Sequence, residues 1–262
     1  MIPWLHNLDE MDAAFLYYSF DSSTVFGSTL VNLGTGGSAY NALMVNNPVI
    51  GTTDKKAGTG AIAFTASSSQ YVQIPAFTTG SSGLTFAFWF KFAGSQSTSR
   101  IFDFGNGLGI DNIQVGLDNS GDLSTFQFNL NVLGANVPGV TGLNVNDGVW
   151  RHFVLVIDGG GNWKVYLNGV LIRTYSNEYY PPSKTRVLNY LGRSNWATDS
   201  YSNGAIDEFY MFFSVLSASD VQALYNAGET RNSVEDFSGK SYVEIILLAR
   251  FLLILSPSVA VL

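Results

Sequence analysis

The sequence predicts an all-β fold over residues 15–228, with many short strands at the spacing typical of a sandwich or barrel. Short apolar runs follow one another closely, and Gly, Asn, Asp and Pro residues separate them, as turns between strands require. Several runs alternate apolar and polar residues, which is the period of a strand. A single segment has the period of a helix. Because 46% of the residues are hydrophobic, the chain has enough apolar side chains for a sizeable core.

Eight candidate strands come in the first half of the chain. The clearest is "LTFAFWFKF" (84–92), where Leu84 and four phenylalanines fall on one face and Trp89 and Lys91 on the other. The eight runs are "FLYYSF" (15–20), "NALMV" (41–45), "AIAFT" (61–65), "YVQIP" (71–75), "LTFAFWFKF", "RIFDFG" (100–105), "IQVGL" (113–117) and "TFQFNLNV" (125–132).

A further strand and a hairpin follow. The run from Trp150 to Ile157 leads through a Gly-rich turn into "NWKVYLNGVLIRTY" (162–175). Its Asn168-Gly169 pair suits a two-residue type I′ turn, in which both central residues need positive φ. Counting outward from that turn, we expect Leu167 to lie opposite Val170 and Val165 opposite Ile172, which gives one apolar face.

The last elements are a strand and a helix. "AIDEFYMFF" (205–213) has the apolar character of a buried strand. In "LSASDVQALYNAG" (216–228), Ser217 and Asp220 form a capping box at the start of an apolar stripe, and Gly228 suits the end of the helix.

Five pieces of this pattern resemble one family when they are taken in order. They are "LYYSFD" (16–21), "GTGAIAFTASSSQYVQIP" (58–75), "LTFAFWFKF", "DGVWRHFVLVIDGGGNWKVYLNGVLI" (147–172) and "NYLGRSNW…NGAIDEFYMFFSVLSASDVQALY" (189–225). Together they resemble the laminin G-like domain of the concanavalin A-like lectin/glucanase superfamily. The resemblance implies an antiparallel jelly-roll sandwich of two curved sheets, to which the pattern above adds one short C-terminal helix. This architecture carries binding modules, enzymes and structural domains, so it leaves the function open.

Composition excludes several classes of protein. Charged residues make up 13% of the chain and the formal net charge is −7, so we expect no nucleic acid partner. The absence of cysteine excludes a disulfide framework and cysteine–zinc sites. The first residues lack a basic stretch followed by an apolar one, so we see no secretory signal there.

Two flanking segments differ from the predicted sandwich. Residues 1–14 form a polar lead-in, and residues 229–262 form an apolar C-terminal tail. Within 241–262, Glu244, Arg250 and Pro257 interrupt the apolar runs, which makes a poor membrane span. Two roles stay open for the tail: attachment to a membrane, or packing against the domain or another subunit of an assembly.

The acidic residues argue against an enzyme. A glycoside hydrolase needs two carboxylates on one face. Glu10 and Asp12 begin a pattern that resembles the Glu-x-Asp-x-x-Glu strand of glycosidases on this fold, but Phe15 stands at the third position. Asp207 and Glu208 are adjacent, so strand alternation directs them to opposite faces. We expect Glu208 to pair with a Lys or Arg.

Alternation also places Asp207 beside Phe209 and Met211, where an acid needs hydrogen bonds or a charged partner. One interpretation is an anchor that accepts backbone N–H groups from a neighbouring loop. The resemblance implies another: a Ca²⁺ ion at the rim of a sheet, with Asp21, Asn32 and Asp207 as its ligands.

Two loops combine aromatic rings with amide and hydroxyl groups, which suits either a sugar or a protein surface. The other interpretation is that the rings pack over the ends of the sandwich. The predicted ligand contacts are Tyr179, Tyr180, Asn195, Trp196 and Tyr201.

The sequence therefore favours a non-catalytic recognition domain that binds a glycan or a protein surface through loops at the edge of the sandwich, with Ca²⁺ as the expected cofactor. The family resemblance alone would place it at a cell surface. The alternative is a structural component of a larger assembly, such as a virion.

Overall fold

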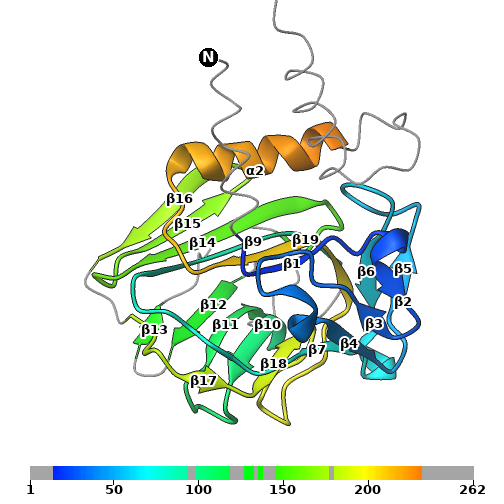
Figure 1. The fold of residues 1–262 in the computed structure, drawn as a ribbon, viewed down its shortest axis with the longest axis horizontal. Helices are drawn as coiled ribbons and strands as arrows, with labels where there is room; N and C mark the ends of the chain where they lie inside the picture. The colour runs from blue at the N-terminus through cyan, green and yellow to red at the C-terminus, as the bar shows by residue number, and fades with distance from the viewer. Residues whose placement is uncertain are drawn as a thin grey trace, which may run out of the picture.

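The computed structural model describes residues 14–93, 98–118, 127–132, 135–137, 145–176 and 180–231. Two large antiparallel sheets pack face to face, and helix α2 (Ala218–Arg231) lies across the outer face of one of them (Figure 1). The predicted concanavalin A-like sandwich with one C-terminal helix is confirmed. Residues 1–13 of the predicted lead-in (1–14) and residues 232–262 of the predicted tail (229–262) lie outside the described residues, and residues 229–231 belong to α2. Within the described ranges, we find no helix with both the length and the hydrophobicity that a membrane span requires.

The sheet beneath α2, here called sheet A, has eight strands. Its order is β16-β15-β14-β9-β19-β6-β5, with β1 paired to β19. The strands are β1 (Leu16–Tyr18), β5 (Val49–Gly51), β6 (Ala61–Phe64), β9 (Gly83–Phe92), β14 (Arg151–Asp158), β15 (Trp163–Leu167), β16 (Val170–Tyr175) and β19 (Gly204–Phe212).

The opposing sheet, here called sheet B, has nine strands in the order β13-β12-β11-β10-β18-β7-β4-β3-β2. They are β2 (Val25–Phe26), β3 (Thr29–Leu30), β4 (Ala42–Val45), β7 (Tyr71–Ile74), β10 (Ser99–Gly105), β11 (Ile113–Asp118), β12 (Gln127–Val132), β13 (Ala135–Val137) and β18 (Leu188–Leu191). Two short strands, β8 (Phe77–Thr78) and β17 (Thr185–Arg186), pair with each other, and short 3-10 turns cover Ser22–Thr24, Gly37–Tyr40 and Ala66–Ser68.

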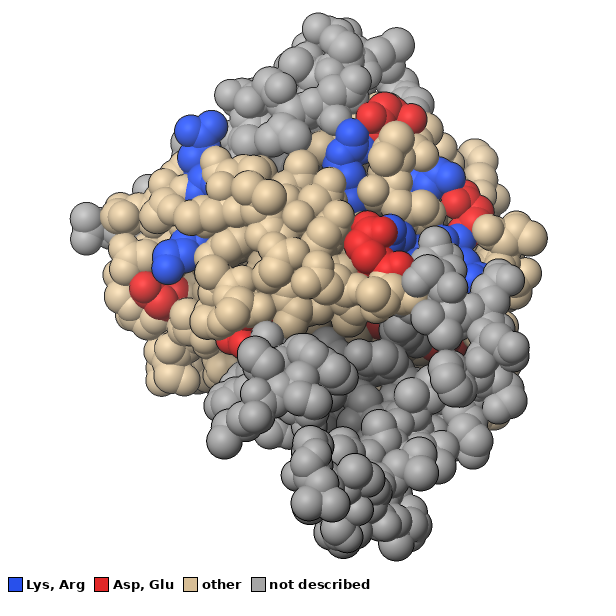
Figure 2. Space-filling view, turned by 90° about the horizontal axis from the view of Figure 1, so that it is seen from above, with Lys and Arg blue, Asp and Glu red and all other residues tan. Residues whose placement is uncertain are grey.

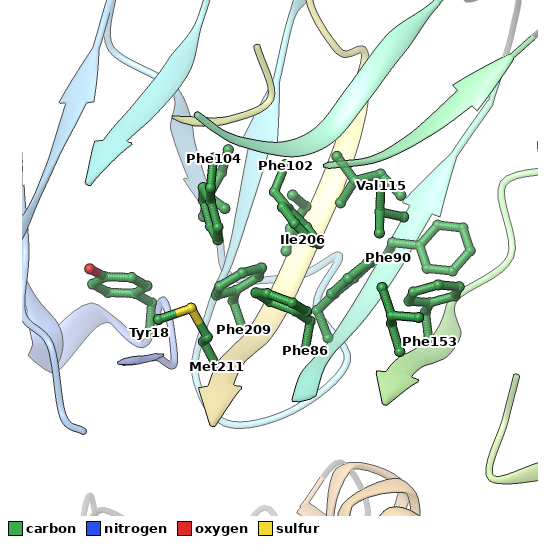
Figure 3. Close-up of a cluster of buried hydrophobic side chains, with 14 of the residues drawn as sticks. Tyr18, Phe86, Phe90, Phe102, Phe104, Val115, Phe153, Ile206, Phe209 and Met211 are labelled. Carbon is green, nitrogen blue, oxygen red and sulfur yellow. The ribbon is translucent and has the colours of Figure 1, made fainter. Parts of the chain in front are cut away.

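Aromatic side chains fill the space between the two sheets. Leu84 and the four phenylalanines of β9 are all buried there, as their alternation predicted. Figure 3 shows Phe86 and Phe209 of sheet A facing Phe102 and Phe104 of sheet B. Phe86 stacks on Phe102 with ring centres 4.8 Å apart, and Phe104 meets Phe209 edge-on at 6.1 Å. Both are geometries that aromatic pairs prefer, so this layer fixes how the sheets face each other.

A second apolar layer lies between sheet A and α2. Val221 and Leu224 of the helix are buried in one cluster with Val154 and Val156 of β14. The predicted capping box is confirmed. The Ser217 N–H donates to Asp220 Oδ2 (2.8 Å) and the Asp220 N–H donates to Ser217 Oγ (3.2 Å).

The predicted end of α2 is wrong, because the helix runs three residues past Gly228 to Arg231. The glycine has a different purpose. A Cβ atom at position 228 would lie 2.7 Å from Cε2 and 2.9 Å from Cζ2 of Trp89, which is 2% exposed. Glycine therefore lets the helix approach the indole ring closely.

The hairpin between β15 and β16 confirms the predicted turn and the predicted pair beside it, Leu167 opposite Val170, but not the predicted pair further from the turn. Asn168 and Gly169 both have positive φ, 49° and 77°. The register shifts between Val165 and Tyr166, so Val165 lies opposite Arg173 and not Ile172. A β-bulge of this kind moves every pair beyond it by one residue.

Charged side chains are scattered over the described part of the face around α2, and neither sign gathers into a patch (Figure 2). Lys91 pairs with Asp54 at 2.8 Å, and Arg151 pairs with Asp147 at 2.6 Å. A face of this kind gives no continuous track of cations for a phosphate backbone.

Candidate functional site

Asp207 and Glu208 lie on the same face of sheet A, so the predicted division between two faces is wrong. Ile206 and Phe209, on either side of the two acids, both point into the core between the sheets. Glu208 has a φ of 51°, and the pairing of β19 with β9 shifts register between Asp207 and Tyr210. This bulge places two successive side chains on the outer face, where α2 lies.

Glu208 ties β1 to β19 through hydroxyl groups. Its Oε2 accepts hydrogen bonds from the Tyr17 hydroxyl (2.9 Å) and the Tyr210 hydroxyl (2.7 Å). The two tyrosine rings stack with their centres 4.3 Å apart. Its printed hydrogen-bond donors are thus two phenols, and the predicted Lys or Arg partner stays a prediction.

Asp207 is an anchor with one oxygen left over. The residue is fully buried, and its Oδ2 accepts the backbone N–H groups of Lys56 (2.9 Å) and Ala57 (2.8 Å). The anchor interpretation is thus confirmed. The other oxygen, Oδ1, is buried and has no hydrogen-bond partner among the residues that the structure describes. Burial holds the pKa of Asp207 well above its ordinary value, and the charges of Glu208 and Asp21 add to this effect.

Asp21, which follows β1 in the sequence, contacts the same loop as Asp207. Its Oδ1 accepts hydrogen bonds from the backbone N–H and the hydroxyl of Thr59, the latter at 3.1 Å. Gly58 has a φ of 57°, and a Cβ there would lie 2.8 Å from the Asp21 carboxyl carbon. Two carboxylates from distant parts of the sequence therefore converge on residues 56–59, here called the 56–59 loop.

Oxygen ligands of this kind suit a hard cation such as Ca²⁺. The orphaned Oδ1 of Asp207, in a site where negative charge accumulates, fits such an ion. Within the described ranges, no three His, Cys, Asp or Glu side chains form a group able to hold a metal. Backbone carbonyls and water would have to complete the coordination.

Asn32 serves another purpose than the one predicted. Its Oδ1 accepts the N–H groups of Tyr17 (2.8 Å) and Gly34 (3.1 Å), and its Nδ2 donates to the carbonyls of Phe15 and Gly37, both at 3.2 Å. The side chain therefore connects the turn after β3 to β1. Because both lone pairs of Oδ1 accept hydrogen bonds, no electron pair is left for a cation.

The outer face of sheet B carries a cluster of rings and one cation, here called the tyrosine–arginine cluster (Tyr71, Tyr190, Arg193 and Tyr201). Tyr71 of β7 and Tyr190 of β18 meet edge-on with centres 5.5 Å apart, and Tyr201 lies 6.1 Å from Tyr71. Their neighbours Val72 and Leu191 point into the core, so alternation puts both strand tyrosines on the outer face.

Residues 192–203 form the loop over this face, here called the 192–203 loop, and hydrogen bonds hold it in shape. Ser194 Oγ donates to Asp199 Oδ2 (2.7 Å), and the Trp196 N–H donates to Ser194 Oγ (3.0 Å). Arg100 pairs with Asp199 at 3.1 Å and lies 5.9 Å from the centre of the Trp196 ring. The Ser202 hydroxyl donates to the Arg100 carbonyl (2.7 Å).

Asn195 anchors this loop to sheet B. Its N–H donates to Asp103 Oδ2 (2.8 Å) and its Nδ2 donates to the Leu188 carbonyl (3.2 Å). Asp103 is fully buried, its Oδ1 accepts from Asn112 (2.8 Å), and burial raises its pKa. The predicted contact Asn195 is therefore in the loop, but its donors are already used within the protein.

Tyr180, the described one of the two tyrosines predicted from the other loop, is not part of this arrangement. Tyr180 packs against the core, and its hydroxyl donates to the Gly80 carbonyl (3.1 Å) at the end of the sandwich. For Tyr180, the interpretation as a packing residue is confirmed. Tyr179 lies outside the described residues.

Sequence reasoning brought Trp196 and Tyr201 into one loop but missed Tyr71, Tyr190 and Arg193. Alternation in "YVQI" and "LNYL" would have put both strand tyrosines on an outer face. The step it lacked is the pairing of β7 with β18, which joins segments more than a hundred residues apart.

The comparisons with known proteins agree with this architecture. A family model described as the concanavalin A-like lectin/glucanases superfamily, Laminin_G_3, matches residues 66–222. A comparison with curated proteins gave no match.

Among solved structures, domain 4 of AbnA, an extracellular arabinanase of family GH43 from Geobacillus stearothermophilus in complex with arabinotriose, has a TM-score of 0.60. It is 21% identical, over 81% of this chain and 98% of that one. The ligand binding domain of botulinum neurotoxin serotype D, in complex with N-acetylneuraminic acid, has a TM-score of 0.57 at 16% identity. That match covers 82% of this chain but 51% of the neurotoxin domain. The binding domain of botulinum neurotoxin serotype G has a TM-score of 0.56 at 16% identity, over 81% of this chain and 50% of that domain.

At these identities the solved structures establish the fold, and the family model covers more than half of the chain. The chain belongs to the concanavalin A-like lectin/glucanase superfamily.

Proposed function

We propose that the protein is a non-catalytic carbohydrate-recognition domain and that the sugar binds at the 192–203 loop over the outer face of sheet B. The observation that carries the proposal is the loop itself. Trp196 and Tyr201 are both half-buried, and the Ser194–Asp199–Arg100 contacts hold the backbone between them. Aromatic faces beside polar groups suit sugar rings, and a loop fixed before binding loses less entropy when the ligand arrives.

The structural relatives support this class of function. The arabinanase domain was solved with arabinotriose and the serotype D neurotoxin domain with N-acetylneuraminic acid. Both have the same fold and each holds a sugar. Their ligands differ, so the relatives support carbohydrate recognition without selecting one sugar.

Burial supports a role without catalysis. The acidic residues that come together, Asp207 and Glu208, are 0% and 4% exposed, and Glu208 bonds to Tyr17 and Tyr210 in the layer beneath α2. A glycosidase needs an acid and a nucleophile on either side of the scissile bond, and a sugar chain has no access to these two carboxylates.

We also propose that Ca²⁺ binds between Asp21 and Asp207 at the 56–59 loop. The support is the orphaned Oδ1 of Asp207 and the raised pKa of its carboxyl group, both of which a bound cation would relieve. Asn32 is left out of this site because its side-chain oxygen already accepts two hydrogen bonds.

A glycan array with Ca²⁺ and with EDTA tests the recognition role. The wild-type chain should bind a defined set of glycans, and Trp196→Ala and Tyr201→Ala should each lose most of that binding. Phe26→Ala is the matched control, because Phe26 is an aromatic residue 65% exposed on β2, at the far edge of sheet B. An array without binding in both conditions, or loss of binding only in the control, would contradict the proposal.

A further inference from the structure

Arg193 lies against two tyrosine rings on the outer face of sheet B. Its guanidinium carbon lies 4.8 Å from the centre of the Tyr71 ring and 4.5 Å from that of Tyr190. The residue is half-buried, so both rings restrict where the guanidinium group can lie. Cation–π contacts of this kind attract a cation without using its N–H donors.

The N–H groups of Arg193 have no protein acceptor among the residues that the structure describes. Five other cations are matched with carboxylates: Lys56 with Glu229, Lys91 with Asp54, Arg100 with Asp199, Arg151 with Asp147 and Lys184 with Asp111. Arg186 is fully buried and donates to backbone carbonyls and a threonine hydroxyl. Arg193 is held in place, yet its hydrogen-bonding capacity is not used.

The nearby acids do not neutralise it. Asp199 is paired with Arg100. Asp103 is fully buried, both of its oxygens accept hydrogen bonds from asparagines, and burial raises its pKa. Among the described residues, Arg193 therefore places a positive charge without a carboxylate partner on the outer face of sheet B. It lies against Tyr71, whose ring centre is 6.1 Å from that of Tyr201.

A guanidinium group offers parallel N–H donors in a fixed plane, which match the two oxygens of a carboxylate. We propose that the ligand is a saccharide with a carboxylate-bearing residue, such as a uronic or sialic acid, whose carboxylate binds Arg193 while the sugar rings contact the 192–203 loop. This inference rests on the proposed carbohydrate-recognition function and names the chemical class of its ligand. Arg193 is then the residue that determines specificity for acidic over neutral sugars.

An array of matched glycans tests the carboxylate requirement across the whole class of sugars. It carries neutral oligosaccharides, the same cores with a uronic or sialic acid, the methyl esters of those acids, and sulfated cores. We expect the wild-type chain to bind the carboxylated set and to bind the esters about 10- to 100-fold more weakly, because hydrogen bonds to a charged group are lost.

Variants assign the effect to one side chain. Arg193→Gln should lower binding of the carboxylated set to the level of the esters, and Arg193→Lys, which keeps the charge but not the fork, should recover only part of it. Arg173→Gln is the matched control, because Arg173 is an exposed arginine on β16 of sheet A. Thermal unfolding followed by circular dichroism verifies that each variant is folded.

The outcomes separate the two proposals. If the wild-type chain binds neutral and esterified glycans as well as the free acids, or binds only the sulfated cores, the carboxylate inference is overturned and carbohydrate recognition stands. If no glycan of any kind is bound, the recognition function fails and the inference fails with it. The ester comparison needs no variant, so it decides the question even if Arg193→Gln does not fold.

Discussion

His152 is the residue whose protonation we expect to limit stability in acid. It lies on β14 and is 2% exposed, with its ring 5.1 Å from that of Trp89 and 6.0 Å from that of Tyr225. Within the described part of the chain, its Nδ1 has no hydrogen-bond partner. Burial, followed by the charge of Lys56, lowers the pKa of His152 from 6.5 to about 3. Folding therefore favours the neutral imidazole.

The sign and size of the effect follow from that difference. Because the pKa of His152 is lower in the folded than in the unfolded chain, its contribution is fully present above pH 6.5 and is lost as the pH falls towards 3. Because the unfolded chain takes up the proton more easily, the unfolding free energy falls by about 2 kcal/mol at pH 5 and by about 3 kcal/mol at pH 4, relative to its value at high pH. Asp207 acts in the opposite direction, because its raised pKa lets the folded chain hold a proton that the unfolded chain releases.

Urea unfolding of the wild-type chain and His152→Gln at pH 7 and pH 5 measures the histidine term alone. The variant keeps Asp207 and every other titrating group, so their contributions cancel in the comparison. We expect the wild-type chain to lose about 2 kcal/mol more than the variant between these two pH values. Equal losses in both proteins would refute the reasoning, because they would show that His152 takes up its proton as easily when folded as when unfolded.

Three further predictions concern the layer beneath α2. Gly228→Ala should lower the unfolding free energy by about 1–3 kcal/mol, because the added methyl group collides with Trp89. At a helix position without such a neighbour, the same substitution would raise the unfolding free energy by up to about 1 kcal/mol. A variant that is more stable than the wild-type chain in urea unfolding would contradict this prediction. Ca²⁺ at about 100 times its dissociation constant should raise the unfolding free energy of the wild-type chain by about 2.7 kcal/mol. The increase should be larger at pH 7.5 than at pH 5, because Asp207 must ionise to bind the ion. Asp207→Asn should lose most of this stabilisation by Ca²⁺. An Asp207→Asn protein whose melting temperature still rises fully with Ca²⁺ would place the ion elsewhere. Tyr17→Phe removes one donor from the buried Glu208 and should cost about 1–3 kcal/mol in urea unfolding, and unchanged stability would show that this hydrogen bond contributes nothing.

The parts of the fold that depend on local pattern were predicted well. Alternation in residues 84–92 placed Leu84 and its phenylalanines in the core, because a regular strand must alternate. Ser217 and Asp220 form the predicted capping box, because that contact spans three residues. Asn168-Gly169 forms the predicted turn for the same local reason.

Local sequence patterns did not predict the β-bulges or the close contact between α2 and Trp89. A left-handed Glu208 broke the alternation of β19 and moved Asp207 to the outer face, and non-glycine residues with positive φ give little local signal. Gly228 was taken for a helix end because its contact, Trp89, lies far away in the sequence. The register of Val165 also depended on a bulge.

The candidate site divides in the same way. Trp196 and Tyr201 were predicted as ligand contacts because they lie in one polar loop, whereas Tyr71 and Tyr190 join them through strand pairing that no local pattern encodes. Asp21 and Asp207 were predicted together on the family resemblance, and the structure brings both to the 56–59 loop. Their role as Ca²⁺ ligands stays a prediction.

The most direct test of the central claim is a crystal structure of the chain soaked with the glycan that binds most tightly on the array. We expect the sugar to lie on the outer face of sheet B, in contact with Trp196 or Tyr201 and with its acidic group at Arg193. A sugar bound against sheet A, or on any surface away from the 192–203 loop, would contradict the account.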